Sequence, residues 1–279
     1  MSITVSNNDL TSLLNAMKRK QTVNGKQQAQ VEALLLTATD NTVLATSLTR
    51  DLSGLSRFQI SAQGMEDDVE SFPVPSIDNL LGILKLHGAQ VTLTFDEEKN
   101  RLRVKSTGKQ TTFDSSKDAK AFSHSPDTIR EFHMKGIELC NRIEHTDGVY
   151  YRTNMGDKIE PIATHRINST EMYEALRCDT MNGQRLNRYR LGIEHGASHL
   201  DVEVGDIHLG QTVTQVGTSL PSTVPWSWQF DGGLDEVFKP FSGDCDLHIF
   251  DFREHGQGMR LLVIWPNGCF AFQAGVLVY

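Results

Sequence analysis

The sequence contains no apolar run that approaches the roughly 18 uncharged residues needed to span a membrane. Its first four residues also lack the charged, apolar and small-residue regions of a signal peptide, so we expect a cytoplasmic protein without membrane contact. The cysteines Cys140, Cys178, Cys245 and Cys269 include no CxxC pair. This spacing argues against a disulfide framework or a zinc ribbon and predicts buried free thiols.

Catalytic signatures are missing as well. The chain has no GxGxxG, no Walker A motif, no GxSxG and no HExxH. Its best cluster of possible metal ligands is Asp244, Asp246 and His248, which share one face of a predicted strand, with His255 nearby. The solvated face of an edge strand explains this cluster better, so we expect no enzyme, no metal and no cofactor.

What the sequence does contain is enough apolar material for a sizeable core. Of its 279 residues, 38% are hydrophobic and 22% are charged, which is typical of a folded globular protein with one large or two medium domains. The 27 Lys and Arg residues against 35 Asp and Glu give a net charge of -8. An acid excess of this size disfavours general contact with nucleic acid.

The first part of the chain alternates strands and helices. A helix is predicted from about Asn8 to Lys20, with Leu10, Leu13, Leu14 and Met17 on one stripe. A second helix follows Pro75-Ser76, with Ile77, Leu80, Leu81 and Leu84 on its stripe. Strands are predicted at 3–5, 33–39, 42–49, 57–62, 90–95, 101–105 and 110–113.

A similar order of elements returns further on. It comprises a strand near 162–167, a cap at Asn168-Ser169 and a helix from about Thr170 to Met181. A short helix is predicted at 234–241, and strands at 186–193, 199–204, 208–215, 224–230, 246–252, 259–265 and 269–273. The repeated order suggests an internal duplication of the fold. Residues 114–125 have the composition of a connection. In 126–161, Ile129, Phe132 and Ile137 fit a helix, whereas Ile143, Val149 and Tyr151 fit strands, so this segment receives no assignment.

This order resembles that of the DNA sliding clamps. The passage from Phe72 to Leu86, FPVPSIDNLLGILKL, looks like the clamp segment in which a strand enters a helix, and the hairpin 91–106 follows it. The run Leu34–Asp51 and the C-terminal hairpin after Asp246 are similar in placement. Within this family, a chain of 279 residues is similar to the two-domain type, like proliferating cell nuclear antigen and several phage clamps.

The resemblance implies an α+β fold of two similar clamp-type domains, each with two helices packed on antiparallel sheets, at 1–113 and 162–279 with a connector or insertion at 114–161. It implies a processivity factor of viral or phage replication, in the host cytoplasm if phage-encoded, that closes as a homotrimeric ring around duplex DNA. DNA polymerase and a clamp loader are the implied partners. The alternatives are a β-rich structural or assembly protein without DNA binding and, less favoured, a metal-dependent hydrolase.

Basic residues support the channel that such a ring requires. They fall on or just beyond the four predicted helices of an acidic protein, where they would contact phosphates without base readout. The alternative is that they are solvated end-cap cations that offset the helix dipoles. The candidate DNA-facing residues are Lys18, Arg19, Lys20, Lys85, Arg177, Arg185 and Lys239.

The resemblance also implies an apolar pocket for short partner motifs, bordered by the C-terminal strand and tail. Packing of these side chains into the protein's own core is the alternative. The matching positions are Leu48, Leu261, Phe272, Ala274, Val276 and Leu277.

Overall fold

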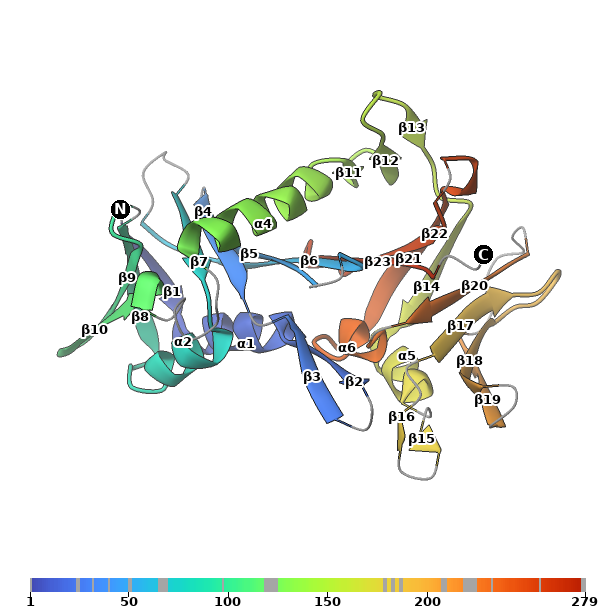
Figure 1. Cartoon of the computed structure of the whole chain (residues 1–279), viewed down its shortest axis with the longest axis horizontal. Helices are drawn as coiled ribbons and strands as arrows, with labels where there is room; N and C mark the ends of the chain where they lie inside the picture. The colour runs from blue at the N-terminus through green and yellow to red at the C-terminus, as the bar shows by residue number, and fades with distance from the viewer. Residues whose placement is uncertain are drawn as a thin grey trace. The chain divides into compact units, whose positions relative to one another are not determined.

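The computed structural model describes residues 2–23, 26–31, 33–39, 41–49, 52–64, 70–96, 98–117, 125–177, 180–181, 184–185, 188–206, 210–217, 225–231, 233–255 and 257–276. The chain divides into two compact units. Unit 1 comprises Met1–Lys18, Val31–Arg50 and Leu55–Cys140, and unit 2 comprises Arg19–Gln30, Asp51–Gly54 and Asn141–Tyr279. Both units combine helices with antiparallel strands, as the ribbon in Figure 1 shows.

Unit 1 contains a four-stranded sheet of order β1-β8-β9-β10 and a run of neighbouring strands of order β6-β5-β4-β7. The sheet consists of β1 Ser2–Ser6, β8 Gln90–Asp96, β9 Arg101–Ser106 and β10 Lys109–Asp114. The run consists of β4 Leu34–Thr39, β5 Thr42–Leu48, β6 Gly54–Ser61 and β7 Glu70–Val74. Along β9, exposed Arg101, Arg103 and Lys105 alternate with buried Leu102 and Val104, so one face of this sheet meets the core and the other meets water.

Two helices of unit 1 have the predicted apolar stripes. Helix α1, Asn7–Met17, is capped by Ser6, whose side chain accepts a hydrogen bond from the Asp9 amide. Helix α2, Ile77–Leu84, is capped in the same way by Ser76. The two helices contact each other. Their buried large side chains are Leu10, Leu13, Leu14 and Met17 in α1 and Ile77, Leu80, Leu81 and Leu84 in α2.

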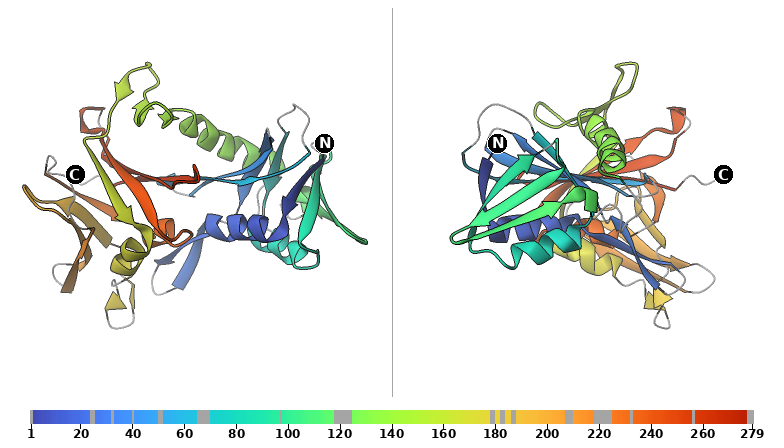
Figure 2. Two further views of the ribbon diagram at one scale, coloured as in Figure 1. Left: turned by 180° about the vertical axis from the view of Figure 1, so that it is seen from behind. Right: turned by 60° about the vertical axis from the view of Figure 1, so that its left-hand side comes forward.

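A third described helix of unit 1, α4 at Pro126–Cys140, occupies much of the segment that received no assignment. It contacts β4, β5 and β7. The views in Figures 1 and 2 agree that α4 and α1 lie on opposite sides of β5, which both helices contact. Six consecutive residues of β5 are buried for this reason, because neither face of the strand is open to water.

Unit 2 repeats this arrangement of strands. Its four-stranded sheet has the order β19-β18-β17-β20, and its run of neighbouring strands has the order β14-β21-β22-β23. The sheet consists of β17 Arg188–Ile193, β18 Leu200–Asp206, β19 Gly210–Val216 and β20 Trp226–Asp231. The run consists of β14 Ala163–Asn168, β21 Asp244–Asp251, β22 Met259–Ile264 and β23 Phe270–Ala274.

The helices and smaller elements of unit 2 complete the repeat. Asn168 caps α5, Ser169–Leu176, by accepting hydrogen bonds from two amides of its first turn, as the sequence predicted. Helix α6 spans Asp235–Phe238 and contacts α5. The smaller elements are the hairpin β2 Arg19–Val23 with β3 Lys26–Val31, the hairpin β15 Thr180–Met181 with β16 Gln184–Arg185, the sheet β11 Ile143–Glu144, β12 Tyr150–Arg152 and β13 Lys158–Ile159, and a 3-10 turn at Arg253–His255.

The strand orders confirm the predicted duplication of the fold. Adding 13 to each strand number converts the order β1-β8-β9-β10 into β14-β21-β22-β23, and β6-β5-β4-β7 into β19-β18-β17-β20. The same shift converts the hairpin β2-β3 into β15-β16. Helices α1 and α2 correspond to α5 and α6 by their positions in the chain order. The α+β fold of two similar halves, each with two helices and antiparallel sheets, is therefore present.

Three predicted helix ends are wrong. Helix α1 ends at Met17 because Lys18 has an extended backbone, so Arg19 and Lys20 belong to β2. Helix α5 ends at Leu176, and Thr180–Met181 already forms β15. Helix α6 has four residues rather than the eight of 234–241. In each case the amphipathic pattern continued past the point where the backbone changes direction.

The structure bears on two expectations from the sequence, the absence of a membrane-spanning helix and the state of the cysteines. No helix among the described residues is long and apolar enough to cross a membrane. Cys140, Cys245 and Cys269 are free and buried, as predicted, and Cys178 lies outside the described residues. Burial raises the pKa of the Cys140 thiol to about 12 and that of Cys245 to about 11, so both stay protonated and unreactive near neutral pH.

Candidate functional site

Four of the predicted DNA-facing residues occupy one recurring position. Lys18, Lys85, Arg177 and Lys239 are the C-cap residues of α1, α2, α5 and α6, respectively. The C-terminal end of a helix carries a partial negative charge, which these cations offset. Each duplicated helix therefore ends in a basic residue, and the position by itself is explained by helix stability as well as by ligand contact.

The surroundings of the four cations differ. Lys18 forms an ion pair with Asp78, and Lys239 lies 3.1 Å from Glu236. Arg177 lies 3.9 Å from Glu174 and packs over the Tyr173 ring. Lys85 is exposed and makes no ion pair with any residue that the structure describes. The carboxylates of Asp78 and Glu174 are exposed, and pairs of this kind are weak, so Lys18 and Arg177 can exchange them for a phosphate at little cost. Glu236 is only 8% exposed, so Lys239 is held more firmly by its pair.

The remaining three cations lie on strands. Lys20 is exposed on β2. Arg185 lies on β16, where it pairs with Thr180. Arg19 is 3% exposed and donates a hydrogen bond to Gln273 Oε1 at 3.1 Å. Because a buried guanidinium cannot reach a phosphate outside the chain, Arg19 leaves the candidate DNA-facing set.

The register of β22 and β23 separates two of the predicted pocket residues. Leu262 is paired with Phe272, and the preceding residue, Leu261, is paired with Gln273. Since paired residues share a face and neighbours along a strand alternate, Leu261 and Phe272 point to opposite faces. Leu261 is fully buried, and its face also carries Ile249 of β21. A pocket on the Phe272 face therefore excludes Leu261.

Aromatic side chains that the sequence did not single out gather on the Phe272 face. Tyr151 of β12 stacks on Phe272 with ring centroids 6.1 Å apart and meets Phe252 edge-on at 5.1 Å. The Arg260 guanidinium lies 5.3 Å and 5.5 Å from the centroids of Phe252 and Phe272. Burial lowers the pKa of Arg260. Phe252 and Phe272 lie more than 100 residues after Tyr151 in the chain, a separation that no sequence periodicity spans.

The C-terminal segment continues from β23 and meets the edge of β20. The Gly275 amide donates to the Met259 carbonyl, and the Val276 amide donates to the Gln229 carbonyl. Val276 is half-buried, and Leu277 lies outside the described residues. The indole nitrogen of Trp228 is buried beside this segment and has no hydrogen-bond partner among the residues that the structure describes.

Two residues of the chain between β5 and β6 add to this surface. The Ala274 amide donates to the carbonyl of Ser53. The neighbouring Leu52 is 56% exposed and has a φ of 60°, a left-handed conformation that a leucine rarely adopts. Strained backbone carrying an exposed apolar side chain is a feature of binding loops. The sequence contained only a Ser-Gly turn signal here.

Leu48, the pocket residue predicted from the first half, is covered within unit 1. It is 3% exposed, and its amide donates to Nδ1 of His133 on α4 at 3.3 Å. Gly136 of the same helix lies directly on the Leu48 side chain, because a Cβ there would come within 3.1 Å of Leu48 Cγ. Burial lowers the pKa of His133 to about 4, which keeps the ring neutral and able to accept this bond.

The candidate metal cluster does not form. β21 pairs with β14 on one side and β22 on the other, so it is no edge strand. Arg166 lies 3.9 Å from carboxylates of both Asp244 and Asp246, and His248 is hydrogen-bonded to Thr164. The described part of the chain holds no group of three potential metal ligands. The acidic residues and the histidine are each satisfied by a neighbour on β14.

Solved structures with the same fold are DNA sliding clamps. The chain is similar to Archaeoglobus fulgidus PCNA bound to the C-terminal region of FEN-1, with a TM-score of 0.62, 13% identity and coverage of 100% of this chain and 99% of that one. It is similar to the Helicobacter pylori beta clamp bound to a DNA ligase peptide, with a TM-score of 0.61, 14% identity and coverage of 100% and 67%. It is similar to the DNA polymerase III beta subunit of Thermotoga maritima, with a TM-score of 0.67, 10% identity and coverage of 100% and 66%.

The sequence alone identifies no relative. No family model matches it, and no curated protein matches it. The fold is nevertheless that of the DNA sliding clamps, as the resemblance in the sequence predicted. The chain spans the whole of the archaeal clamp and about two thirds of the bacterial chains.

Proposed function

We propose that this chain is a sliding clamp that encircles duplex DNA and tethers a DNA polymerase, without catalysis or a cofactor. The observation that carries the proposal is the duplicated clamp fold, which extends over the full length of both this chain and an archaeal PCNA. A protein of this kind would act in the cytoplasm, or in that of the host if a phage encodes it. The clamp domains would be residues 1–113 and 162–279, joined by 114–161.

The proposed ring is a homotrimer. Strand β10 is the edge of its sheet in unit 1, and β19 is the edge of its sheet in unit 2. Their exposed residues include Lys109, Gln110 and the large apolar Val213, which is 55% exposed. An open edge of this kind is a template for pairing with another chain, and head-to-tail pairing closes a ring. Light scattering or native mass spectrometry should give about three times 31.2 kDa at micromolar concentrations.

The proposed DNA-facing set is Lys18, Lys20, Lys85, Arg177, Arg185 and Lys239. Replacing Lys18, Lys20, Lys85 and Arg177 by Glu should abolish stimulation of the cognate polymerase on primed circular templates. The unfolding midpoint should change little, because exposed charges contribute little to stability. A matched control replaces Arg103 and Lys105, which are exposed on β9, by Glu with the same change in net charge per substitution. Equal loss of processivity in both variants would remove the DNA-facing assignment.

The proposed partner site lies on the Phe272 face in unit 2. It keeps Ala274, Val276 and Leu277 of the original set and adds Leu52, which is 56% exposed. Phe272 is 3% exposed beneath Tyr151, so it supports the site from within unit 2 and leaves the set of partner-contacting residues. The solved clamps that carry FEN-1 and DNA ligase peptides support a role in binding such segments. Leu52→Ala should weaken binding of the cognate polymerase by roughly fivefold or more, because truncating an apolar anchor that a partner buries typically costs over 1 kcal/mol. Surface plasmon resonance with the immobilised clamp measures this change, and Arg103→Ala on β9 is the control.

A further inference from the structure

Arg260 of β22 is a half-buried cation to which the described part of the chain supplies no carboxylate. The guanidinium makes no ion pair with a described residue, although the protein has 35 acidic residues against 27 basic ones. Burial lowers its pKa, and the opposing influence comes from Tyr151 and not from a carboxylate. Because removing a charge from water without a counter-charge costs free energy, an unpaired cation in this place points to an anion that a ligand supplies.

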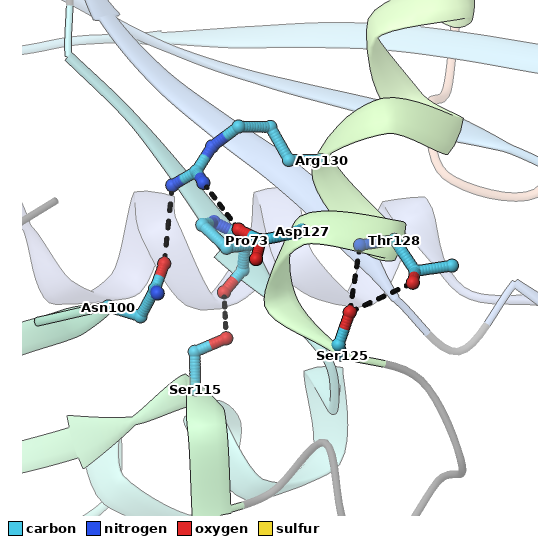
Figure 3. Close-up of polar contacts among 7 residues, drawn as sticks. All are labelled: Pro73, Asn100, Ser115, Ser125, Asp127, Thr128 and Arg130. Carbon is cyan, nitrogen blue, oxygen red and sulfur yellow. Dashed lines mark hydrogen bonds and ion pairs between the residues drawn. The ribbon is translucent and has the colours of Figure 1, made fainter. Parts of the chain in front are cut away.

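Two other arginines show the usual arrangement. Arg130 of α4 donates a hydrogen bond to the Asp127 carboxylate at 3.4 Å, as Figure 3 shows. Arg253, which follows β21, donates from Nε to both carboxylate oxygens of Asp251 at 2.9 Å and 3.0 Å. In both cases the carboxylate lies two or three residues away in the chain, and Arg260 has no such neighbour.

The register of β21 and β22 explains why no carboxylate of this sheet reaches Arg260. Arg260 is paired with Phe250, so the next residue of β21, Asp251, points to the opposite face. On the face of Arg260, the nearest acidic residue of β21 is Asp246, which is paired with Ile264, four residues further along β22. At about 3.3 Å for each residue, this offset amounts to roughly 13 Å. The pairing of the strands therefore keeps the cation apart from these carboxylates.

The guanidinium is nevertheless held in a defined place. It lies 5.3 Å and 5.5 Å from the ring centroids of Phe252 and Phe272, which support it by cation–π contact. Its Nη2 donates to Oε1 of the exposed Gln257, which is its one hydrogen bond to a described residue. The other N–H donors keep the planar arrangement that binds a carboxylate through two parallel hydrogen bonds. Because the bond to Gln257 lies at the surface, a ligand can reach this end of the side chain without displacing any part of the protein.

Arg260 borders the proposed partner site. It is paired across β22 and β23 with Ala274, and paired residues share a face. The Ala274 amide donates to the carbonyl of Ser53, the residue after the exposed Leu52. We propose that Arg260 is the anion-binding residue of this site and binds a carboxylate of a partner protein, on a segment where an acidic residue stands beside an apolar one. This rests on the proposed function, which makes Leu52 and Ala274 contacts of a partner.

A single carboxylate suits this position better than a nucleic-acid backbone. Asp251 ends β21, and Glu254 is exposed in the 3-10 turn that follows Phe252. A chain of phosphates would bring several negative charges close to these two carboxylates, whereas an isolated carboxylate can contact Arg260 alone. Leu52, which is 56% exposed, offers the apolar contact that the neighbouring residue of the partner requires.

A pair of small probes tests the anion site without DNA or polymerase. The probes are 3-(4-fluorophenyl)propionate and its amide, which share an apolar ring and differ in charge. Fluorine NMR titration of the full chain should show the propionate binding roughly tenfold more tightly than the amide. Arg260→Gln should abolish this preference, and Arg260→Lys, which keeps the charge without the planar fork, should reduce it by about threefold or more. Arg253→Gln removes the same charge on the other face and should leave the preference within about twofold.

The result that would overturn the proposal is equal binding of the two probes, or a preference that persists in a folded Arg260→Gln chain. If that chain does not fold, an unchanged preference in Arg260→Lys overturns it instead. Inorganic phosphate that competes as strongly as the propionate would assign the site to a phosphate and reject the carboxylate. A chain extended by Gly-Ser-Gly-Ser after Tyr279 moves the terminal carboxylate away, and tighter probe binding to it would identify the protein's own C-terminus as the occupant.

Polymerase affinity separates this inference from the proposed function. Arg260→Gln should weaken binding of the cognate polymerase by roughly tenfold, because a charge-assisted hydrogen bond is lost. A polymerase that binds both chains equally rejects the role of Arg260 and keeps the clamp. Probe binding at Arg260 in a protein that stimulates no polymerase keeps the anion site and rejects the clamp.

Discussion

The two halves of the molecule have equivalent strand orders, but one corresponding strand face is basic and exposed in the first half and largely apolar and covered in the second. In the first half, β9 presents Arg101, Arg103 and Lys105 to water. In the second half, the corresponding strand β22 carries Arg260, Leu262 and Ile264 on the face that it shares with Phe272 and Phe270. Topology alone therefore does not decide which sheet faces are wet. The side chains at alternate positions do, and duplication left them free to diverge.

The apolar face of β22 and β23 is covered by the segment between the two repeats. Tyr151 of the short strand β12 stacks on Phe272, and His145 lies edge-on to Phe270 at 5.7 Å. Both residues come from the segment between the repeats, which has no equivalent elsewhere in the duplicated order. An exposed apolar face would promote aggregation, so the inserted segment and the apolar residues beneath it require each other.

The largest expected effect comes from truncating matched positions of the two outer faces. Leu262 is fully buried, and Leu262→Ala should lower the free energy of unfolding by about 2–5 kcal/mol. Arg103→Ala on β9 should change it by no more than about 0.5 kcal/mol, because Arg103 is exposed. Urea unfolding followed by circular dichroism measures both values. Similar losses in the two variants would mean that the faces do not differ as described.

A second contrast concerns close packing at the end of β23. A Cβ on Gly275 would overlap Trp228 Cδ1, so Gly275→Ala requires the indole to move and should cost about 1–3 kcal/mol. Gly88→Ala in unit 1 meets nothing within 4 Å and should be close to neutral. Thermal unfolding compares the two, with tryptophan fluorescence reporting the displaced indole. An unchanged emission spectrum in Gly275→Ala would contradict the contact.

Much of the fold could be predicted from the sequence because its signals are local. The stripe Leu10, Leu13, Leu14 and Met17 predicted α1, and Ser76 and Asn168 predicted helix starts that the structure confirms. Helix α4 could not be assigned, since its buried stripe contains His133, Gly136 and Cys140 in place of large aliphatic residues. The fully buried positions therefore lack the large apolar residues whose spacing reveals a helix in a sequence.

The candidate sites were less accessible to sequence reasoning. Arg19 looked like its neighbours Lys18 and Lys20, and only the turn from α1 into β2 buries it against Gln273. The opposite orientations of Leu261 and Phe272 depend on the register of β22 with β23, which composition does not specify. Tyr151 and Phe272 are brought together by tertiary packing alone.

Each half also contains a buried neutral histidine that should make stability depend on pH. Burial lowers the pKa of His133 in unit 1 and of His248 in unit 2 from 6.5 to about 4. The unfolded chain then binds more protons between pH 6.5 and 4, so the free energy of unfolding falls as the pH drops through that window. From pH 7 to pH 5 each histidine should account for a loss of about 1–2 kcal/mol. Urea unfolding at both pH values measures the loss, and His133→Gln and His248→Gln should each remove its own part of the slope.

The smallest effect on stability is expected from the C-terminal tail, which extends β23 in unit 2. Deleting Val276–Tyr279 removes one described backbone hydrogen bond, from Val276 to Gln229, so the free energy of unfolding should fall by no more than about 1.5 kcal/mol. Binding of the cognate polymerase should weaken by roughly 1–3 kcal/mol if Val276 and Leu277 are apolar anchors. Trimer formation should persist, since the proposed ring contacts are the edges of β10 and β19. Calorimetric titration and light scattering on the truncated chain measure binding and assembly separately. Loss of the fold, or unchanged affinity for the polymerase, would show that the tail serves packing within unit 2 and not partner binding.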